Sequence, residues 1–191
     1  MEQLIQWELS LLHSIQEFAT PLWDTLWTSV TMLGESGIFW IVLSLVLMIP
    51  KKTRRAGFSM GLALLIGLIL CNGVMKNVFA RPRPYHLDPT LAHRLAWGEM
   101  STDFSFPSGH TTASFEGAVA LILRHKKWGT VALVAAFLIA ISRICLIVHY
   151  PTDVVFGAVF GAAYAFLASW VVDTLWRLYD KKQEEKKQKQ A

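Results

Sequence analysis

Residues 57–78 read GFSMGLALLIGLILCNGVMKNV, and residues 128–147 read WGTVALVAAFLIAISRICLI. Each stretch is close to the ~20 apolar residues with which a helix crosses a bilayer. Residues 154–172 form a third run of this kind. Residues 36–49 and 110–123 form two shorter runs, which would have to tilt little or lie in thinned bilayer. The pattern predicts an all-α integral membrane protein with five spans.

The distribution of charge fits this topology. Of the 191 residues, 53% are hydrophobic and only 17% are charged, which is too apolar for a soluble domain of this length. Most Lys and Arg residues lie in three clusters, at 51–55, 124–127 and 177–189. Alternating spans put all three clusters on one face, which the positive-inside rule makes cytoplasmic. The net charge of +4 therefore reflects topology, and we expect no nucleic acid partner.

Three regions are expected along the chain. Residues 1–35 place apolar side chains at helical spacing, which predicts amphipathic helices at the membrane interface; a sixth span packed against protein is the alternative. No basic stretch precedes an apolar core there, so no cleavable signal peptide is expected. Residues 36–178 form the transmembrane core. Residues 179–191 form a basic cytoplasmic tail, whose Lys, Gln and Glu composition predicts a frayed end.

The external face carries five cations against its charge bias: Lys76, Arg81, Arg83, Arg94 and Arg143. Lys76 is followed after six residues by Arg83-Pro84. The prolines at 82 and 84 disfavour helix before them, so Arg83 is expected in extended backbone just beyond a helix. Arg81 by itself is interpreted as reaching to the lipid headgroups. Lys76 and Arg83 are candidates for binding an anion.

The sequence Pro107-Ser108-Gly109-His110 precedes an apolar run. Ser108 is a typical N-cap, with Gly109 and His110 in the first turn of the helix. Free N–H groups and the positive end of the helix dipole suit a phosphate, and glycine permits close approach. The alternative is an ordinary capped helix with an interfacial histidine.

Ser142-Arg143 ends one span, and Tyr150-Pro151-Thr152-Asp153 opens the next, with His149 just before it. Pro151 suits the first helical position, and Asp153 lies in the first turn. Asp153 can accept one ring N–H of His149, which leaves the other ring nitrogen as a nucleophile. Arg143 offers a fork of donors to phosphate oxygens. The alternative is that the His149–Asp153 pair only caps the helix.

Together these three motifs resemble the signature of the type 2 phosphatidic acid phosphatase superfamily, which includes membrane lipid phosphatases and vanadium haloperoxidases. The resemblance covers about residues 36–175 and implies a helical bundle of five or six transmembrane helices with an external active-site loop. It further implies that His149 attacks phosphorus, that Asp153 orients His149, and that His110 protonates the leaving oxygen and then activates water. The phosphate oxygens would be held by Lys76, Arg83, Ser108, the Gly109 N–H and Arg143.

By this resemblance the chain is expected to hydrolyse a phosphate monoester or diphosphate on a membrane lipid through a phosphohistidine. No metal or other cofactor is expected. Phosphatidate, phosphatidylglycerol phosphate and polyprenyl diphosphates are candidate substrates, and the small size favours recycling of an undecaprenyl-type carrier. The expected location is the plasma membrane, with the site outside and the C-terminus in the cytoplasm. A haloperoxidase-like enzyme and a non-catalytic lipid-phosphate binding or transport protein are the alternatives. The oligomeric state is left open.

Some polar residues do not belong to any of the three motifs. Glu116 lies roughly 9 Å beyond His110 along the predicted helix and is expected to make a structural hydrogen bond. The loop residues His86, Asp88, His93, Glu99 and Asp103 fit no familiar metal spacing and are expected to be solvated. Trp97 and Met100 are candidates for touching the bilayer or the lipid substrate.

Overall fold

The computed structural model describes residues 2–96 and 102–188, and these are helical with no strand. The helices are α1 (Glu2–Phe18), α2 (Pro21–Met32), the 3₁₀ helix η1 (Glu35–Gly37), α3 (Ile38–Met48), α4 (Arg54–Gly67), the π-helix η2 (Leu68–Met75), α5 (Lys76–Phe79), α6 (Pro84–Leu87), α7 (Gly109–Ile122), α8 (Lys126–Cys145) and α9 (Pro151–Gln188). The five predicted apolar runs all lie in these helices, which confirms the helical membrane bundle.

Within residues 2–96 and 102–188, four helical stretches are long and apolar enough to cross a membrane: Pro21–Met48, Arg54–Leu87, Lys126–Cys145 and Pro151–Gln188. Helix α7 has only 14 residues, and most of its side chains are buried. It packs against α4, α8 and α9. Helix α7 is therefore shielded from lipid by its neighbours, so it needs no apolar surface long enough to match the bilayer.

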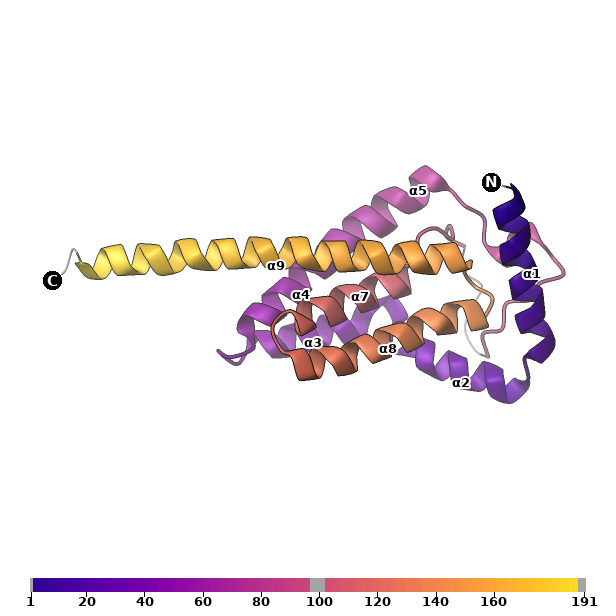
Figure 1. The fold of residues 1–191 in the computed structure, drawn as a ribbon, viewed down its shortest axis with the longest axis horizontal. Helices are drawn as coiled ribbons and strands as arrows, with labels where there is room; N and C mark the ends of the chain where they lie inside the picture. The colour runs from indigo at the N-terminus through magenta and orange to yellow at the C-terminus, as the bar shows by residue number, and fades with distance from the viewer. Residues whose placement is uncertain (1, 97–101, 189–191) are drawn as a thin grey trace.

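The two N-terminal helices have different environments. Helix α1 crosses the end of the bundle at a steep angle to α9 (Figure 1) and buries Glu8, Leu9 and Leu12. Helix α2 begins at Pro21. The preceding residue, Thr20, caps the helix, because its side chain accepts a hydrogen bond from the N–H of Trp23 at 3.3 Å. A short kink at 36–37 then joins α2 to α3. The first long apolar stretch therefore starts inside residues 1–35 rather than at residue 36.

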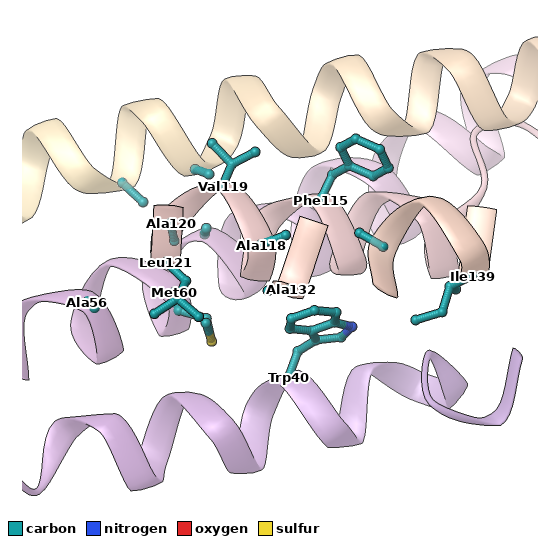
Figure 2. Close-up of a cluster of buried hydrophobic side chains, with 14 of the residues drawn as sticks. Trp40, Ala56, Met60, Phe115, Ala118, Val119, Ala120, Leu121, Ala132 and Ile139 are labelled. Carbon is teal, nitrogen blue, oxygen red and sulfur yellow. The ribbon is translucent and has the colours of Figure 1, made fainter. Parts of the chain in front are cut away.

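The core of the bundle is packed around one tryptophan. Figure 2 shows Trp40 projecting from α3 into a cluster that includes Ala118 of α7 and Ala132 of α8. The Trp40 ring lies so close to Gly117 that a Cβ there would overlap it. The Trp40 indole N–H donates to Ser114 Oγ at 3.1 Å, so its polar atom is satisfied. Small residues on α7 thus let the neighbouring helices approach closely.

Helix α9 has 38 residues and continues to Gln188. The expectation of a frayed tail is therefore wrong for residues 179–188, which form the C-terminal turns of α9 and extend beyond the other helices (Figure 1). Asp173 of α9 accepts a hydrogen bond from Arg124 at 2.8 Å. This contact ties α9 to the α7–α8 loop.

One end of the bundle collects the ends of several core helices. Helices α5 and α8 end there, α7 and α9 begin there, and α1 crosses it (Figure 1). The α3–α4 and α7–α8 loops lie at the opposite end. All three predicted motifs are therefore brought to the same end.

Candidate active site

A cavity of about 610 Å³ lies at this end, between α3, α4 and α7. Six of the eight predicted site residues line it: Lys76, Arg83, Gly109, His110, Arg143 and His149. The other two, Ser108 and Asp153, are fully buried and do not line the cavity. Residues up to 73 positions apart in the sequence thus line the same cavity.

Lys76 and Arg83 reach the cavity through an unusual segment of backbone. After Gly67 the helix widens into the π-helix η2, which ends at Met75, just before Lys76. Such π segments are rare and are often found at functional sites. Ala80 then ends α5 in the left-handed region, with φ of 43°. Arg83 follows in extended backbone, as the flanking prolines predicted.

Asp103 holds the two cations together. Its carboxylate accepts from Lys76 Nζ and from Arg83 Nη2, and its carbonyl accepts from Arg83 Nε at 3.1 Å. Asp103 was predicted to be a solvated loop residue; it is exposed, but the prediction missed its contacts with both cations. Its side chain remains 44% exposed, so its anion lies at the mouth of the cavity rather than deep in the bundle.

Ser108 occupies the N-cap position of α7, as predicted, but its side chain does not cap the helix. Its N–H donates to the Asp153 carbonyl at 3.1 Å, and its Oγ accepts from Thr111 Oγ1 at 3.0 Å. Gly109 packs directly against Asn72, where an added Cβ would lie 3.0 Å from the amide oxygen. His110 faces the cavity, with Nε2 3.3 Å from Glu35 Oε2.

His149 stands on a tight turn after α8. The N–H groups of Val148 and His149 both donate to the Arg143 carbonyl, at 3.2 and 3.3 Å. Ile147 adopts a φ of 57°, which is unfavourable for a β-branched residue. Strain of this kind persists only where the surrounding structure enforces it, and it is concentrated at functional sites.

The two ring nitrogens of His149 have different surroundings. Nδ1 lies 3.4 Å from both Ser105 Oγ and Asp153 Oδ2, whereas Nε2 lies 3.4 Å from Arg83 Nη1. Burial lowers the pKa of His149 well below its usual range, and the guanidinium groups of Arg83 and Arg143 act in the same direction. At neutral pH the imidazole is therefore uncharged and keeps a lone pair.

Asp153 belongs to a chain of charged contacts that the sequence did not reveal. Arg81 donates to Asp153 Oδ1 and to Glu8 Oε2, both at 2.6 Å, and lies over the Tyr150 ring at 3.7 Å. Glu8 Oε1 accepts from the N–H and hydroxyl of Thr152 at 2.9 and 2.6 Å. The interpretation of Arg81 as a headgroup contact is therefore wrong.

Asp153 also caps α9, because its Oδ2 accepts the N–H of Tyr150 at 3.0 Å. Ser105 Oγ donates to the same oxygen. One carboxylate thus lies beside His149 Nδ1 and caps α9, a geometry compatible with both the orienting role and the capping alternative. Glu8 connects this cap to α1 in two ways, by its pairing with Arg81 across more than 70 positions and by its bonds to Thr152.

Arg143, near the end of α8, lines the cavity and contacts α2. Its Nη1 donates to Thr31 Oγ1 at 2.5 Å, while its buried Nε has no hydrogen-bond partner within residues 2–96 and 102–188. A buried donor without a partner carries a free-energy cost that an oxyanion could remove.

The far part of the cavity is apolar. It runs between α3 and α4 and is lined there by residues that include Ile41, Leu45, Leu65 and Leu68. Glu116 faces this part, and its buried Oε1 has no hydrogen-bond partner among the described residues. The structural hydrogen bond expected for Glu116 is therefore not made by that atom.

The remaining predictions concern the external loop. Asp88 is not simply solvated, because it pairs with His13 of α1 at 2.9 Å. Arg94 pairs with Asp24 of α2 at 2.8 Å. Across the described residues, no group of three His, Cys, Asp or Glu side chains is suited to hold a metal ion. Trp97, Glu99 and Met100 lie outside the described residues.

Comparison with known proteins places this geometry in a family. The undecaprenyl-diphosphatase of Sulfolobus acidocaldarius is 34% identical over 137 residues, which cover 71% of this chain and 64% of that relative. The chain thus spans just under two thirds of that relative's length.

Two crystal structures resemble the whole fold. A transmembrane PAP2 type phosphatidylglycerolphosphate phosphatase from Bacillus subtilis has a TM-score of 0.71 at 27% identity, covering 88% of this chain and 86% of that one. LpxE from Aquifex aeolicus has a TM-score of 0.69 at 28% identity, covering 84% and 93%. Residues 54–177, which hold every motif residue, match the PAP2 superfamily. The chain is a multi-pass membrane protein and belongs to the PAP2 superfamily.

Proposed function

We propose that this protein hydrolyses a phosphate monoester or diphosphate on a membrane lipid through a covalent phosphohistidine. The observation that carries the proposal is the set of residues that line the cavity of about 610 Å³. Lys76, Arg83 and Arg143 line it together with His110 and His149, and an apolar channel continues from them between α3 and α4. A phosphate bound by the cations could leave its lipid chain in that channel.

In the first step His149 Nε2 attacks phosphorus, an N–P bond forms, and the P–O bond to the leaving group breaks. Nε2 is assigned because Nδ1 faces Ser105 and Asp153. Asp153 stabilises the positive charge that develops on the ring. His110 donates a proton to the leaving oxygen.

In the second step His110, now neutral, takes a proton from water as the water attacks phosphorus. The N–P bond breaks, and inorganic phosphate leaves. Lys76, Arg83, Arg143 and the Gly109 N–H neutralise the equatorial oxygens in both steps. Three cations supply the charge that a metal ion supplies in many phosphoryl-transfer enzymes, which supports a metal-independent reaction.

The names of the relatives suggest the class of substrate. The Sulfolobus relative is called an undecaprenyl-diphosphatase, and the Bacillus structure a phosphatidylglycerolphosphate phosphatase. We place polyprenyl diphosphate first among the candidates, followed by phosphatidylglycerol phosphate and phosphatidate. The basic clusters at the opposite end support a cytoplasmic C-terminus in the plasma membrane and an active site on the external face.

The test is a panel of lipid phosphates offered to the purified protein with a chelator present, scored by release of inorganic phosphate. Release from at least one lipid, with the rate unchanged by chelator, is expected. Tight binding of these lipids with no release would favour the non-catalytic alternative. Turnover that depends on added vanadate and peroxide would favour the haloperoxidase alternative.

A further inference from the structure

A second cavity, of about 450 Å³, lies at the end of the bundle opposite the active site. The α3–α4 loop, the start of α4, the α7–α8 loop and α9 enclose it. Its lining residues are Lys51, Lys52, Arg54, Arg55, Ala56, Arg124, His125 and Trp176. This basic cavity shares no residue with the active-site cavity.

Positive charge is concentrated around the basic cavity. Five of its lining residues are Lys or Arg, and none is acidic. Two carboxylates that do not line the cavity neutralise part of this charge: Asp173 contacts Arg124 at 2.8 Å, and Asp180 contacts Arg55 at 3.4 Å. Lys51 and Lys52 have no such partner in the described parts of the chain. Cations this close repel one another, so an anion in the cavity would lower their free energy.

Unused hydrogen-bond donors face the same region. Helices α4 and α8 both begin there, and their N-cap residues, Thr53 and His125, provide no side-chain cap. The positive ends of two helix dipoles therefore lie at the basic cavity, although the Arg54 N–H is already bonded to the Pro50 carbonyl at 3.0 Å. Arg124 Nε is buried without a partner among the described residues. A tetrahedral oxyanion has enough acceptor oxygens to serve donors from both helices.

One wall of the basic cavity is aromatic. Trp176 lines it, packs against Phe58 with ring centroids 5.4 Å apart, and lies under Arg55 at 5.6 Å. Tryptophan is enriched where the bilayer meets water. A ligand with a phosphate beside an apolar chain would satisfy both the cations and this wall.

We propose that the basic cavity binds the phosphate of an anionic phospholipid headgroup, at a site separate from the one that binds substrate. The positive-inside rule explains why cations occur in these loops, but it does not require them to enclose one cavity between two uncapped helix termini. The bound headgroup would link the α3–α4 loop, the α7–α8 loop and α9. The proposal does not depend on the reaction catalysed at the other end.

The test measures binding of phosphatidylglycerol to the full-length protein in neutral-lipid nanodiscs, by native mass spectrometry over a titration. The key variant is the double substitution Lys51→Gln, Lys52→Gln, which removes two exposed charges and breaks no contact. The matched control, Lys181→Gln, Lys182→Gln, removes the same charge from the exposed tail of α9. A parallel titration uses inorganic phosphate with no anionic lipid.

Saturable binding is expected, weakened roughly tenfold by the Lys51, Lys52 variant and little changed by the tail variant. Equal weakening by both variants would overturn the proposal, because it would mean general surface attraction. Absence of saturable binding would also overturn it. If inorganic phosphate binds as tightly as the lipid does and is weakened equally by the Lys51, Lys52 variant, the lipid assignment is wrong and free phosphate is the ligand.

Discussion

The two ends of the bundle both gather cations around a cavity, but they hold them differently. At the active-site end the Arg83 side chain is only 3% exposed, and its partners fix each of its nitrogens. At the basic cavity the Arg55 side chain is 45% exposed and has one weak ion pair. A cluster of cations around a cavity is therefore not sufficient for the proposed catalysis. The proposed reaction also needs a buried nucleophile of fixed orientation, which is the role proposed for His149 at the first end.

The largest expected effect comes from removing the nucleophile. His149→Ala should reduce kcat by at least ~10⁴-fold, because no other side chain at the cavity can replace Nε2. Phosphate release from the preferred lipid measures the effect. His125→Ala, a histidine at the other end, is the matched control and should retain full activity. Activity in His149→Ala within tenfold of the parent would refute the assigned nucleophile.

His110→Ala should lower kcat by roughly 10²- to 10⁴-fold on a lipid substrate, the range typical of a lost general acid. The loss should be much smaller on p-nitrophenyl phosphate, whose leaving group needs no proton. Rates on both substrates measure the difference. An equal loss on both would show that His110 does not protonate the leaving oxygen in the first step.

Arg81→Met tests whether the chain from Glu8 to Asp153 positions His149. We expect activity to fall roughly 10- to 100-fold, as for other groups that orient a catalytic side chain. Without Arg81 the Asp153 charge is less neutralised and stabilises protonated His149 more, so the His149 pKa should rise. Because only neutral His149 is a nucleophile, the acid limb of kcat/KM should move to higher pH.

The pH profiles of parent and variant are compared on one substrate, so that ionisation of the substrate cancels. Arg94→Met, which breaks the pair with Asp24 instead, should leave the acid limb in place. A limb that is unchanged in Arg81→Met would mean that the contact serves only the fold.

The smallest effect concerns Asp103, whose carboxylate contacts both Lys76 and Arg83. A substrate phosphate would compete with it for the same cations. Asp103→Asn should therefore lower KM by up to about fivefold, since a half-exposed ion pair is worth no more than ~1 kcal/mol. Steady-state kinetics measure the KM. The control is Asp88→Asn, which removes another acidic side chain of the same loop and should leave the KM unchanged. An increase in KM would indicate that Asp103 orders the cations instead of competing for them.

The sequence predicted the helical bundle well, because apolar length and charge bias are direct consequences of the bilayer. Six of the eight predicted site residues line the cavity, because the three motifs fall at helix ends that alternation brings to one face. The expectation for α9 failed because composition alone favours fraying at residues 179–188, whereas these residues continue a helix already nucleated in the bundle.

The contacts that cross between distant segments could not be predicted. Glu8 looked like one polar residue on an amphipathic helix, and its partner Arg81 lies 73 positions away. Asp103 was one of several acids in a long loop, and nothing local identified it as the partner of Lys76. The π-helix before Lys76 also left no signal in the sequence.

The proposed reaction requires that His149 becomes covalently phosphorylated within the cavity. The most direct measurement is rapid chemical quench during the first turnover of a phosphate-labelled substrate, followed by peptide mapping under alkaline conditions that preserve N–P bonds. We predict acid-labile phosphate on the peptide that contains His149, formed before inorganic phosphate appears and longer lived in His110→Ala. Label on another residue, or turnover with no labelled protein in either form, would contradict the account.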